Sequence, residues 1–242
     1  MAALGFVGGQ GMSDLITMDD LSNDEILEIL DAAERLLPVA NGDVYAALLQ
    51  GKVLGNLFFE NSTRTRMSFE SAMKRLGGEV VNLSSVGSSV AKGETLYDTM
   101  QMVDGYSDIA VIRHPRQGAA QYSADAIGIP VLNAGDGAGN HPTQTMLDLF
   151  TIRQAHGTLE GLNVVLVGDL RYGRTTHSLS HALVRFGAKL TLVSPDSLRM
   201  PNEIVGYLQS HGADVAETEN FAGAIADADV IYMTRIQKER FP

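Results

Sequence analysis

The 242-residue chain contains no cysteine, which excludes a disulfide framework, thiol catalysis and a thiolate metal site. It also lacks an apolar run near the roughly 18 residues that a membrane-spanning helix needs. Residues 1–11 are rich in glycine and lack the basic start of a signal peptide. We therefore expect no membrane partner and a cytoplasmic location.

Positive charge is scarce as well, because 18 lysines and arginines stand against 29 aspartates and glutamates, for a formal net charge of -11. Phosphate backbones are bound by basic surfaces, so this balance argues against nucleic acid as a partner. An anionic substrate would have to be drawn in by a local basic cluster. The histidines and carboxylates show no metal-ligand spacing, and no Walker A lysine motif occurs.

The chain alternates between strand-like and helix-like segments. The expected strands are residues 53–59, 79–83, 108–112, 129–132, 162–168, 190–193, 213–215 and 229–233. This βαβα alternation predicts an α/β fold with doubly wound parallel sheets, whose ligands gather at the carboxyl ends of the strands. We expect two domains, residues 1–150 and 151–242, joined by a long helix from His141 to Gln154. In the first domain, Ser22 is expected to cap a helix that ends near Pro38.

The corner between the first strand and the following helix carries three hydroxyls and two guanidiniums within residues 62–66. Ser62 or Thr63 falls at the helix N-cap, where free backbone N–H groups and the helix dipole favour a phosphate or another dianion. Arg64 and Arg66 point about 200° apart on a helix, so we assign Arg64 to the ligand and leave Arg66 in support. The alternative is an ordinary hydroxyl cap with two solvated arginines.

Two further groups are expected at the carboxyl ends of the strands. Arg113 follows the strand 108–112, and the loop 133–141 contains glycines that let the backbone approach a ligand closely. His141 stands at the end of that loop and opens the next helix. A histidine before a proline is commonly a capping residue, but the glycine-rich loop favours a functional role.

The corner after Gly168 could be a dinucleotide-binding fingerprint, with Asp196 as the ribose-binding acid. The run from Gly168 to Gly173 does not match the pattern G-x-G-x-x-G, and the bulky Tyr172 and Arg174 would crowd a pyrophosphate. The fingerprint is therefore the weaker interpretation of the second half of the chain.

Residues 58–70, with the run Phe-Phe-Glu-Asn-Ser-Thr-Arg-Thr-Arg-Met-Ser-Phe-Glu, resemble the carbamoyl-phosphate signature of the transcarbamoylase family. Members of that family that use aspartate are similar to this chain in four more runs, at residues 113–115, 141–150, 168–178 and 233–240. Members that use ornithine share the first signature but diverge in the second domain. The resemblance extends from about Leu21 to Arg240.

The resemblance implies transfer of the carbamoyl group of carbamoyl phosphate to the amino group of L-aspartate, which gives N-carbamoyl-L-aspartate and phosphate for pyrimidine biosynthesis. It implies no metal and no organic cofactor. The residues implied for carbamoyl phosphate are Ser62, Thr63, Arg64 and Thr65 at the phosphate, Thr65, Arg113 and His141 at the carbonyl oxygen, and Gln144 at the amide nitrogen. Of these, the implied catalytic residues are Arg64, Thr65, Arg113 and His141. For aspartate, whose two carboxylates suit paired guanidinium donors, the implied residues are Arg174, Arg235 and Gln237.

The resemblance also implies a homotrimer whose active sites are shared between subunits. The loop 84–93 would then reach the site of the neighbouring subunit, where Ser88 and Lys92 complete the phosphate pocket. From the residues alone, this serine-rich stretch is typical of an ordinary surface loop. Regulatory subunits are a further class of partner that the family suggests.

Members of the family continue beyond the point at which this sequence stops, at Pro242, with further strands and helices. We therefore expect an unpaired sheet edge in the second domain, and either an incomplete sequence or a truncated form. Two alternatives stay open. One is an ornithine-type carbamoyltransferase, which Arg174 and Arg235 disfavour, and the other is a non-catalytic module that binds carbamoyl phosphate or serves in assembly.

Overall fold

The structure is a computed structural model and describes residues 14–84, 93–137 and 139–235. The chain divides into two compact units. Unit 1 consists of Met1–Asp20 and Arg35–Gly137, and unit 2 consists of Leu21–Glu34 and Ala138–Pro242. The helix α1 (Asn23–Asn41) contributes residues to both. The predicted domain boundary at residue 150 stays a prediction.

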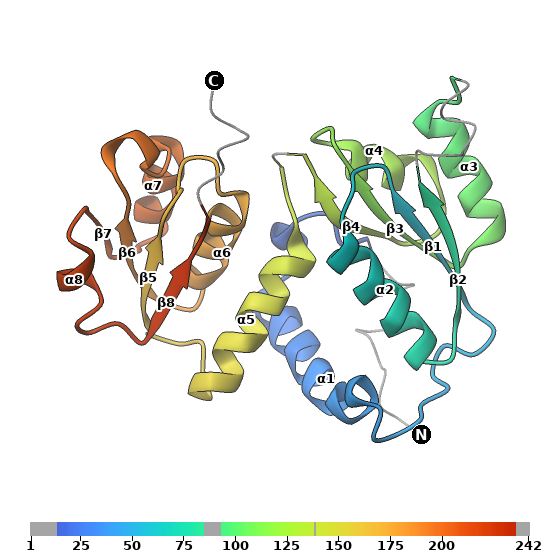
Figure 1. The fold of residues 1–242 in the computed structure, drawn as a ribbon, viewed down its shortest axis with the longest axis horizontal. Helices are drawn as coiled ribbons and strands as arrows, with labels where there is room; N and C mark the ends of the chain where they lie inside the picture. The colour runs from blue at the N-terminus through green and yellow to red at the C-terminus, as the bar shows by residue number, and fades with distance from the viewer. Residues whose placement is uncertain (1–13, 85–92, 138, 236–242) are drawn as a thin grey trace. The chain divides into compact units, whose positions relative to one another are not determined.

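Unit 1 contains one sheet of four parallel strands in the order β2-β1-β3-β4 (Figure 1). After the short 3-10 helix η1 (Met18–Asp20), its elements are β1 (Val53–Phe58), α2 (Thr63–Arg75), β2 (Glu79–Ser84), α3 (Leu96–Tyr106), β3 (Ile109–His114), α4 (Ala119–Ala126) and β4 (Val131–Asp136). A helix between successive parallel strands is the crossover that such a sheet requires. The predicted α/β class is therefore confirmed.

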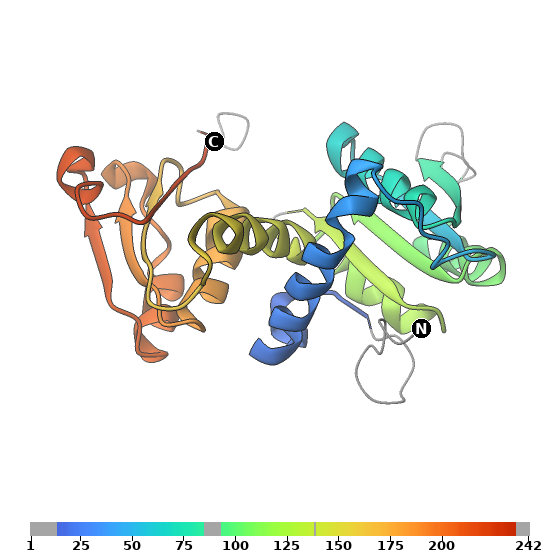
Figure 2. The same ribbon diagram turned by 90° about the horizontal axis from the view of Figure 1, so that it is seen from below.

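Helices cover both faces of this sheet (Figures 1 and 2). On β1, Leu54 and Phe58 pack with Met73 of α2. Leu57, whose side chain points to the opposite face, packs with Met100 of α3. The sheet is thus doubly wound, as predicted, and its strand ends are the surfaces that the helices leave uncovered.

Unit 2 contains a second sheet of four parallel strands, in the order β7-β6-β5-β8. Its elements after the end of unit 1 are α5 (Pro142–His156), β5 (Asn163–Val167), α6 (Arg174–Val184), β6 (Lys189–Val193), η3 (Asp196–Leu198), α7 (Asn202–Ser210), β7 (Val215–Thr218), α8 (Phe221–Ala224) and β8 (Val230–Met233). On β5, the consecutive residues Val164, Val165 and Leu166 are all buried. A strand buried on both faces is typical of a parallel sheet between helices.

Helix α1 begins as the sequence predicts but ends later. The Ser22 hydroxyl accepts a hydrogen bond from the Glu25 backbone N–H at 3.2 Å, and the Glu25 carboxylate accepts one from the Ser22 N–H at 2.8 Å. These bonds form a capping box. The predicted end near Pro38 is wrong, because the helix runs to Asn41. Proline removes a single i→i−4 bond, and in the last turn little of the helix follows it.

Two strands are also placed differently from the prediction. β4 spans Val131–Asp136 rather than residues 129–132, so the predicted loop from residue 133 begins only after Asp136. Pairing with β3 extends the strand, and the Asn133 side chain accepts a hydrogen bond from the Gly135 N–H at 2.8 Å. β7 spans Val215–Thr218 rather than residues 213–215, because its register with β6 continues to Thr218. Sheet pairing overrides the turn-forming composition of residues 133–136, and it also sets where β7 ends.

The joining role predicted for the helix from His141 to Gln154 stays a prediction, although a helix does form there as α5. Within the described residues, β8 lies at an edge of its sheet, and the Ile231 and Met233 side chains are exposed. None of the helices in the described part of the chain has the length and apolar character needed to cross a membrane.

Candidate functional site

The order of strands in unit 1 creates a switch point between β1 and β3. From β1 the chain crosses to β2, which pairs with one edge of β1, and it later returns to β3, which pairs with the other edge of β1. Ligands of doubly wound sheets bind outside the carboxyl ends of the strands at such a point. Phe58 at the end of β1 lies opposite Arg113 at the end of β3, and the Phe59 N–H donates to the Arg113 carbonyl at 2.8 Å. Ser62 therefore follows β1, and Arg113 lies within β3, one residue before its last residue His114, so both predicted residues stand at the carboxyl ends of the strands that flank the switch point.

The amino end of α2 has the features that an anion site needs. Ser62 is its N-cap residue, with an extended backbone, and its side chain makes no capping hydrogen bond. The Ser62 hydroxyl instead donates to the Thr65 hydroxyl at 3.0 Å. Ser62 and Thr65 are half-buried, whereas Thr63 and Arg64 are exposed. Because the cap side chain does not occupy the N–H groups of the first turn, that end of the helix keeps its affinity for an anion.

Arg113 is a buried cation at the end of β3, with 9% of its surface exposed. Its Nη1 donates to the Ala134 carbonyl at 3.1 Å, and its Nη2 lies 3.4 Å from Oε1 of Glu60. The Nε of Arg113 and Oε2 of Glu60 are buried and have no hydrogen-bond partner among the described protein groups. A buried donor without a partner is costly, and an anionic ligand would supply one. Sequence reasoning missed Glu60, although it lies inside the run 58–70.

The turn that follows β3 is stabilised by the His114 side chain and by a close approach of the backbone at Gly137. Nδ1 of His114 accepts a hydrogen bond from the Arg116 N–H at 3.0 Å, and its ring lies 5.4 Å from the Phe59 ring. Burial lowers the pKa of His114, which favours the neutral ring that this acceptor role requires. Gly137 has a φ of 58°, and a Cβ there would lie 2.4 Å from the Pro115 carbonyl oxygen.

Unit 2 has its own switch point, between β5 and β8. The chain leaves β5 for β6 and β7 on one side and returns to β8 on the other. Arg174 is the first residue of α6, the helix that follows β5, and the exposed Arg235 follows β8. The predicted aspartate-binding arginines thus follow the two strands that flank this switch point.

The two strand ends of this switch point are tied together by the backbone. The Thr234 N–H donates to the Val167 carbonyl at 2.9 Å. Gly168 has a φ of 117°, and a Cβ there would lie 2.4 Å from the Thr234 carbonyl oxygen. The buried Asp169 accepts a hydrogen bond from the Tyr172 N–H at 3.0 Å. These contacts fix the backbone segments that lead to Arg174 and Arg235.

Helix α5 carries the two remaining predicted residues that the structure describes. His141 is its N-cap residue and is buried, and Nδ1 of its ring lies 3.3 Å from the Thr143 hydroxyl. The Gln144 side chain donates through Nε2 to Oδ1 of Asp148 at 3.0 Å. Oδ2 of Asp148 accepts a hydrogen bond from the Tyr232 hydroxyl at 3.2 Å. Burial raises the pKa of Asp148, and burial followed by the Asp148 charge raises the pKa of Tyr232 to about 12.

The predicted site residues divide between the two units. Unit 1 holds Ser62, Thr63, Arg64, Thr65 and Arg113, while unit 2 holds His141, Gln144, Arg174 and Arg235. Ser88, Lys92 and Gln237 lie outside the described residues. Sequence reasoning also missed Asp148 and Tyr232. The spacing of Gln144 and Asp148 by one helical turn was the available signal for the former, whereas nothing in the sequence links Tyr232 to them.

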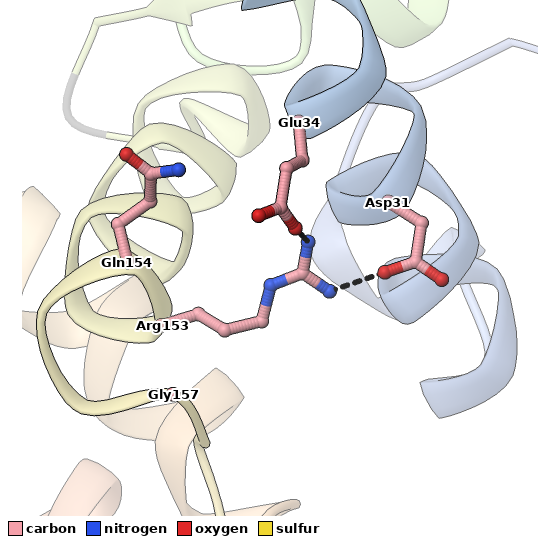
Figure 3. A pocket seen from close by; sticks show the side chains of 5 residues that line it. All are labelled: Asp31, Glu34, Arg153, Gln154 and Gly157. Atoms are coloured by element: carbon pink, nitrogen blue, oxygen red, sulfur yellow. Dashed lines mark hydrogen bonds and ion pairs between the residues drawn. The ribbon is translucent and has the colours of Figure 1, made fainter.

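A cavity of about 370 Å³ in unit 2 contains none of these residues. It is lined by Asp31, Glu34, Arg153, Gln154 and Gly157 (Figure 3). The Arg153 guanidinium lies 2.6 Å from the Asp31 carboxylate and 3.5 Å from that of Glu34. These ion pairs join α1 to α5, so the charged side chains that line the cavity have a structural role. In the described part of the chain, no group of three or more histidines or carboxylates could hold a metal ion.

Comparisons with known proteins match both halves of the chain. Residues 13–154 match the family described as "Aspartate/ornithine carbamoyltransferase, carbamoyl-P binding domain", and residues 160–241 match "Aspartate/ornithine carbamoyltransferase, Asp/Orn binding domain". A relative from Methanococcoides burtonii, named aspartate carbamoyltransferase catalytic subunit, is 55% identical over 229 residues, which cover 94% of this chain and 74% of the relative. A relative of the same name from Thermococcus kodakarensis is 54% identical over 230 residues, which cover 95% of this chain and 74% of the relative.

Solved structures give the same picture. The catalytic subunit of aspartate transcarbamoylase from M. jannaschii superposes with a TM-score of 0.90 at 49% identity, over 96% of this chain and 76% of that one. Aspartate transcarbamoylase from Trypanosoma cruzi, solved in complex with carbamoyl phosphate and aspartate, superposes with a TM-score of 0.89 at 42% identity, over 95% of this chain and 74% of that one. These identities are high enough for the likeness to extend beyond the fold.

Proposed function

The chain belongs to the aspartate/ornithine carbamoyltransferase family, and we propose that it transfers the carbamoyl group of carbamoyl phosphate to the amino group of L-aspartate. The products are N-carbamoyl-L-aspartate and phosphate. The observation that carries the proposal is the buried Arg113, whose Nε has no partner among the described residues. It lies at the switch point that the amino end of α2, with Ser62, also flanks. Relatives more than half identical to the chain are named for this activity, which favours aspartate over ornithine.

Carbamoyl phosphate is proposed to bind at the amino end of α2. Its phosphate would accept hydrogen bonds from the hydroxyls and N–H groups of residues 62–65 and from the Arg64 guanidinium. The half-buried Ser62 and Thr65 hydroxyls, already 3.0 Å apart, support a preorganised site. Arg113 and Thr65 would donate to the carbonyl oxygen. The contacts of His141 with that oxygen and of Gln144 with the amide nitrogen remain predictions.

Aspartate is proposed to bind through Arg174 and Arg235. A guanidinium binds a carboxylate through two parallel N–H donors, and aspartate offers two carboxylates. One arginine follows each strand of the β5–β8 switch point, which supports a separate partner for each carboxylate. Gln237 is the third predicted residue for aspartate and lies outside the described residues.

The proposed reaction begins when the aspartate amine attacks the carbonyl carbon of carbamoyl phosphate. The carbonyl oxygen becomes an oxyanion, which the donors predicted for it would stabilise by about 3 kcal/mol each. The bond between that carbon and the phosphate oxygen then breaks, and phosphate leaves with the proton of the amine. Two anions must be brought together, so charge neutralisation and positioning are expected to supply much of the rate.

A homotrimer is part of the proposal, since the predicted phosphate pocket includes Ser88 and Lys92 of a neighbouring subunit. Association would be tested by measuring the mass of the chain in solution by light scattering, where a monomer at micromolar concentration would contradict it. A cytoplasmic location and the binding of regulatory subunits remain predictions.

The activity is tested by following carbamoyl-aspartate formation with the 242-residue chain, with L-ornithine as the parallel amine. We expect turnover with aspartate only, and its loss in Arg64→Ala. Lys74→Ala is the matched control, because Lys74 is an exposed cation at the other end of α2, where it pairs with Glu70 at 2.7 Å. No turnover with either amine, together with retained binding of carbamoyl phosphate, would favour a non-catalytic binding module instead.

A further inference from the structure

Asp148 links Gln144, which is predicted to bind carbamoyl phosphate, to β8, the strand that leads to the predicted aspartate-binding residue Arg235. It lies on α5 one turn after Gln144, so the two side chains share a helix face. Its Oδ1 accepts the Gln144 side-chain donor at 3.0 Å, and its Oδ2 accepts the Tyr232 hydroxyl at 3.2 Å. Tyr232 lies on β8, three residues before Arg235. All of these residues belong to unit 2.

The chemistry of Asp148 decides which way the Gln144 amide faces. An ionised carboxylate only accepts hydrogen bonds, whereas a glutamine side chain has an NH2 donor and a carbonyl acceptor at the same end. Gln144 must therefore present its NH2 group to Asp148. Its carbonyl oxygen Oε1 is left to accept a hydrogen bond from another group. The amide nitrogen of a carbamoyl group is a donor, so Oε1 is the atom of Gln144 that suits it.

Tyr232 supports the charged form of Asp148. A tyrosine hydroxyl is protonated near neutral pH and can donate, and burial raises the pKa of Tyr232 further, to about 12. The Thr175 side chain on α6 also hydrogen-bonds to Tyr232. Burial raises the pKa of Asp148, and the hydrogen bonds from Gln144 and Tyr232 oppose that rise. Both donors favour the acceptor-only carboxylate that orients Gln144.

We propose that Asp148 is a positioning residue for carbamoyl phosphate, which fixes the Gln144 amide so that its carbonyl oxygen receives the carbamoyl NH2 group. This inference rests on the proposed function. Asp148 does not touch the substrate and acts through Gln144. The competing explanation is that Asp148 only ties α5 to β8, in which case its loss would reduce stability and leave ligand affinity unchanged.

The first test is Asp148→Asn, measured by calorimetric titration with carbamoyl phosphate. An asparagine can donate its own NH2 group to Oε1 of Gln144. The Gln144 amide can then turn so that its NH2 group faces the carbamoyl NH2 group, and two donors that face each other form no hydrogen bond. We expect affinity for carbamoyl phosphate to fall on the order of tenfold, the effect of one hydrogen bond. The matched control is Asp125→Asn, because Gln121 donates to Asp125 at 2.9 Å with the same spacing on α4, at an exposed position. That variant should bind like the unmodified chain.

The second test separates positioning from stability by a double-mutant cycle. Gln144→Ala should weaken carbamoyl phosphate binding by itself, and adding Asp148→Asn should then produce little further loss. A loss of the same size with and without Gln144 would overturn the positioning role. Thermal unfolding of each variant shows whether the chains compared are equally folded.

The outcomes for the inference and for the proposed function differ. If the unmodified chain binds carbamoyl phosphate and Asp148→Asn binds it equally well, the positioning role is wrong and the proposed function stands. If the unmodified chain binds no carbamoyl phosphate, the proposed function is wrong and the inference falls with it. A selective loss in Asp148→Asn that requires Gln144 supports both.

Discussion

The two units place their arginines in different surroundings around the same topological feature. In unit 1 the switch point lies between β1 and β3, beside a buried guanidinium and a helix end with half-buried hydroxyls. In unit 2 it lies between β5 and β8, where Arg235 is exposed and Arg174 is half-buried. The first arrangement suits a compact dianion that is enclosed by donors. The second suits a ligand with two carboxylates, because Arg174 and Arg235 follow different strands and each guanidinium can pair with its own carboxylate.

Arg113 provides the largest expected effect on this comparison. Arg113→Lys keeps the positive charge but cannot donate to Ala134 and to a ligand with the same planar geometry. We expect kcat/KM to fall by about 10² to 10³, the cost of one lost donor to an oxyanion. Steady-state kinetics measure it, with Arg199→Lys as a surface control that pairs with Asp196. A change below threefold would show that Arg113 is structural.

Arg235 tests the other side of the comparison. Arg235→Ala should raise the KM for aspartate by about 10- to 100-fold, since charge-assisted hydrogen bonds contribute about 1.5–3 kcal/mol. Carbamoyl phosphate binding, measured alone by calorimetry, should be unchanged. If instead carbamoyl phosphate binding is lost and the KM for aspartate is not, the two switch points have been assigned to the wrong substrates.

Gly168 tests whether the backbone of the second switch point sets its geometry. Alanine at a φ of 117° would place Cβ 2.4 Å from the Thr234 carbonyl oxygen, next to Arg235. We expect Gly168→Ala to cost about 1–3 kcal/mol of unfolding free energy and to raise the KM for aspartate. Urea denaturation and kinetics measure the two effects. Gly187→Ala is the control, because Gly187 also has a positive φ, but a Cβ added there meets no atom of the described residues beyond its chain neighbours within 4 Å. Equal kinetics in both variants would contradict the prediction.

Ser62 sharpens the comparison with a smaller change. Because its hydroxyl makes no capping hydrogen bond, Ser62→Ala should leave stability nearly unchanged, in contrast to the loss of about 1 kcal/mol usual for a cap. Affinity for carbamoyl phosphate should nonetheless fall several-fold, because one donor to the phosphate is gone. Thermal unfolding and calorimetric titration separate the two results. A large loss of stability without a loss of affinity would make Ser62 a structural cap.

His114 gives the smallest expected effect, on stability alone. Burial lowers its pKa in the folded chain, so the folded state binds its proton less well than the unfolded state does. The stability that the neutral ring contributes is present above the unfolded pKa of about 6.5 and is lost as the pH falls through the folded value. His114→Asn should reduce the loss of stability between pH 8 and pH 5, measured by urea denaturation. His156→Asn, at an exposed position on α5, is the control.

Local sequence alone determined the elements and the corners between them. Residues 62–66 predict a helix N-terminus with an anion site, and α2 does begin at Thr63 with Ser62 as its N-cap. Apolar runs predict the buried strands, since a strand covered on both faces must be apolar throughout. The signature in residues 58–70 indicated the family, and the comparisons agree with it.

Tertiary structure decided the features that depend on residues far apart in sequence. Strand pairing with β3 extends β4 to Asp136. The strand order, which creates the switch points, follows from pairing between β1 and β3 and between β5 and β8. The bond from Tyr232 to Asp148 joins residues 84 positions apart. No local pattern encodes such a contact, because it exists only once the two elements have packed together.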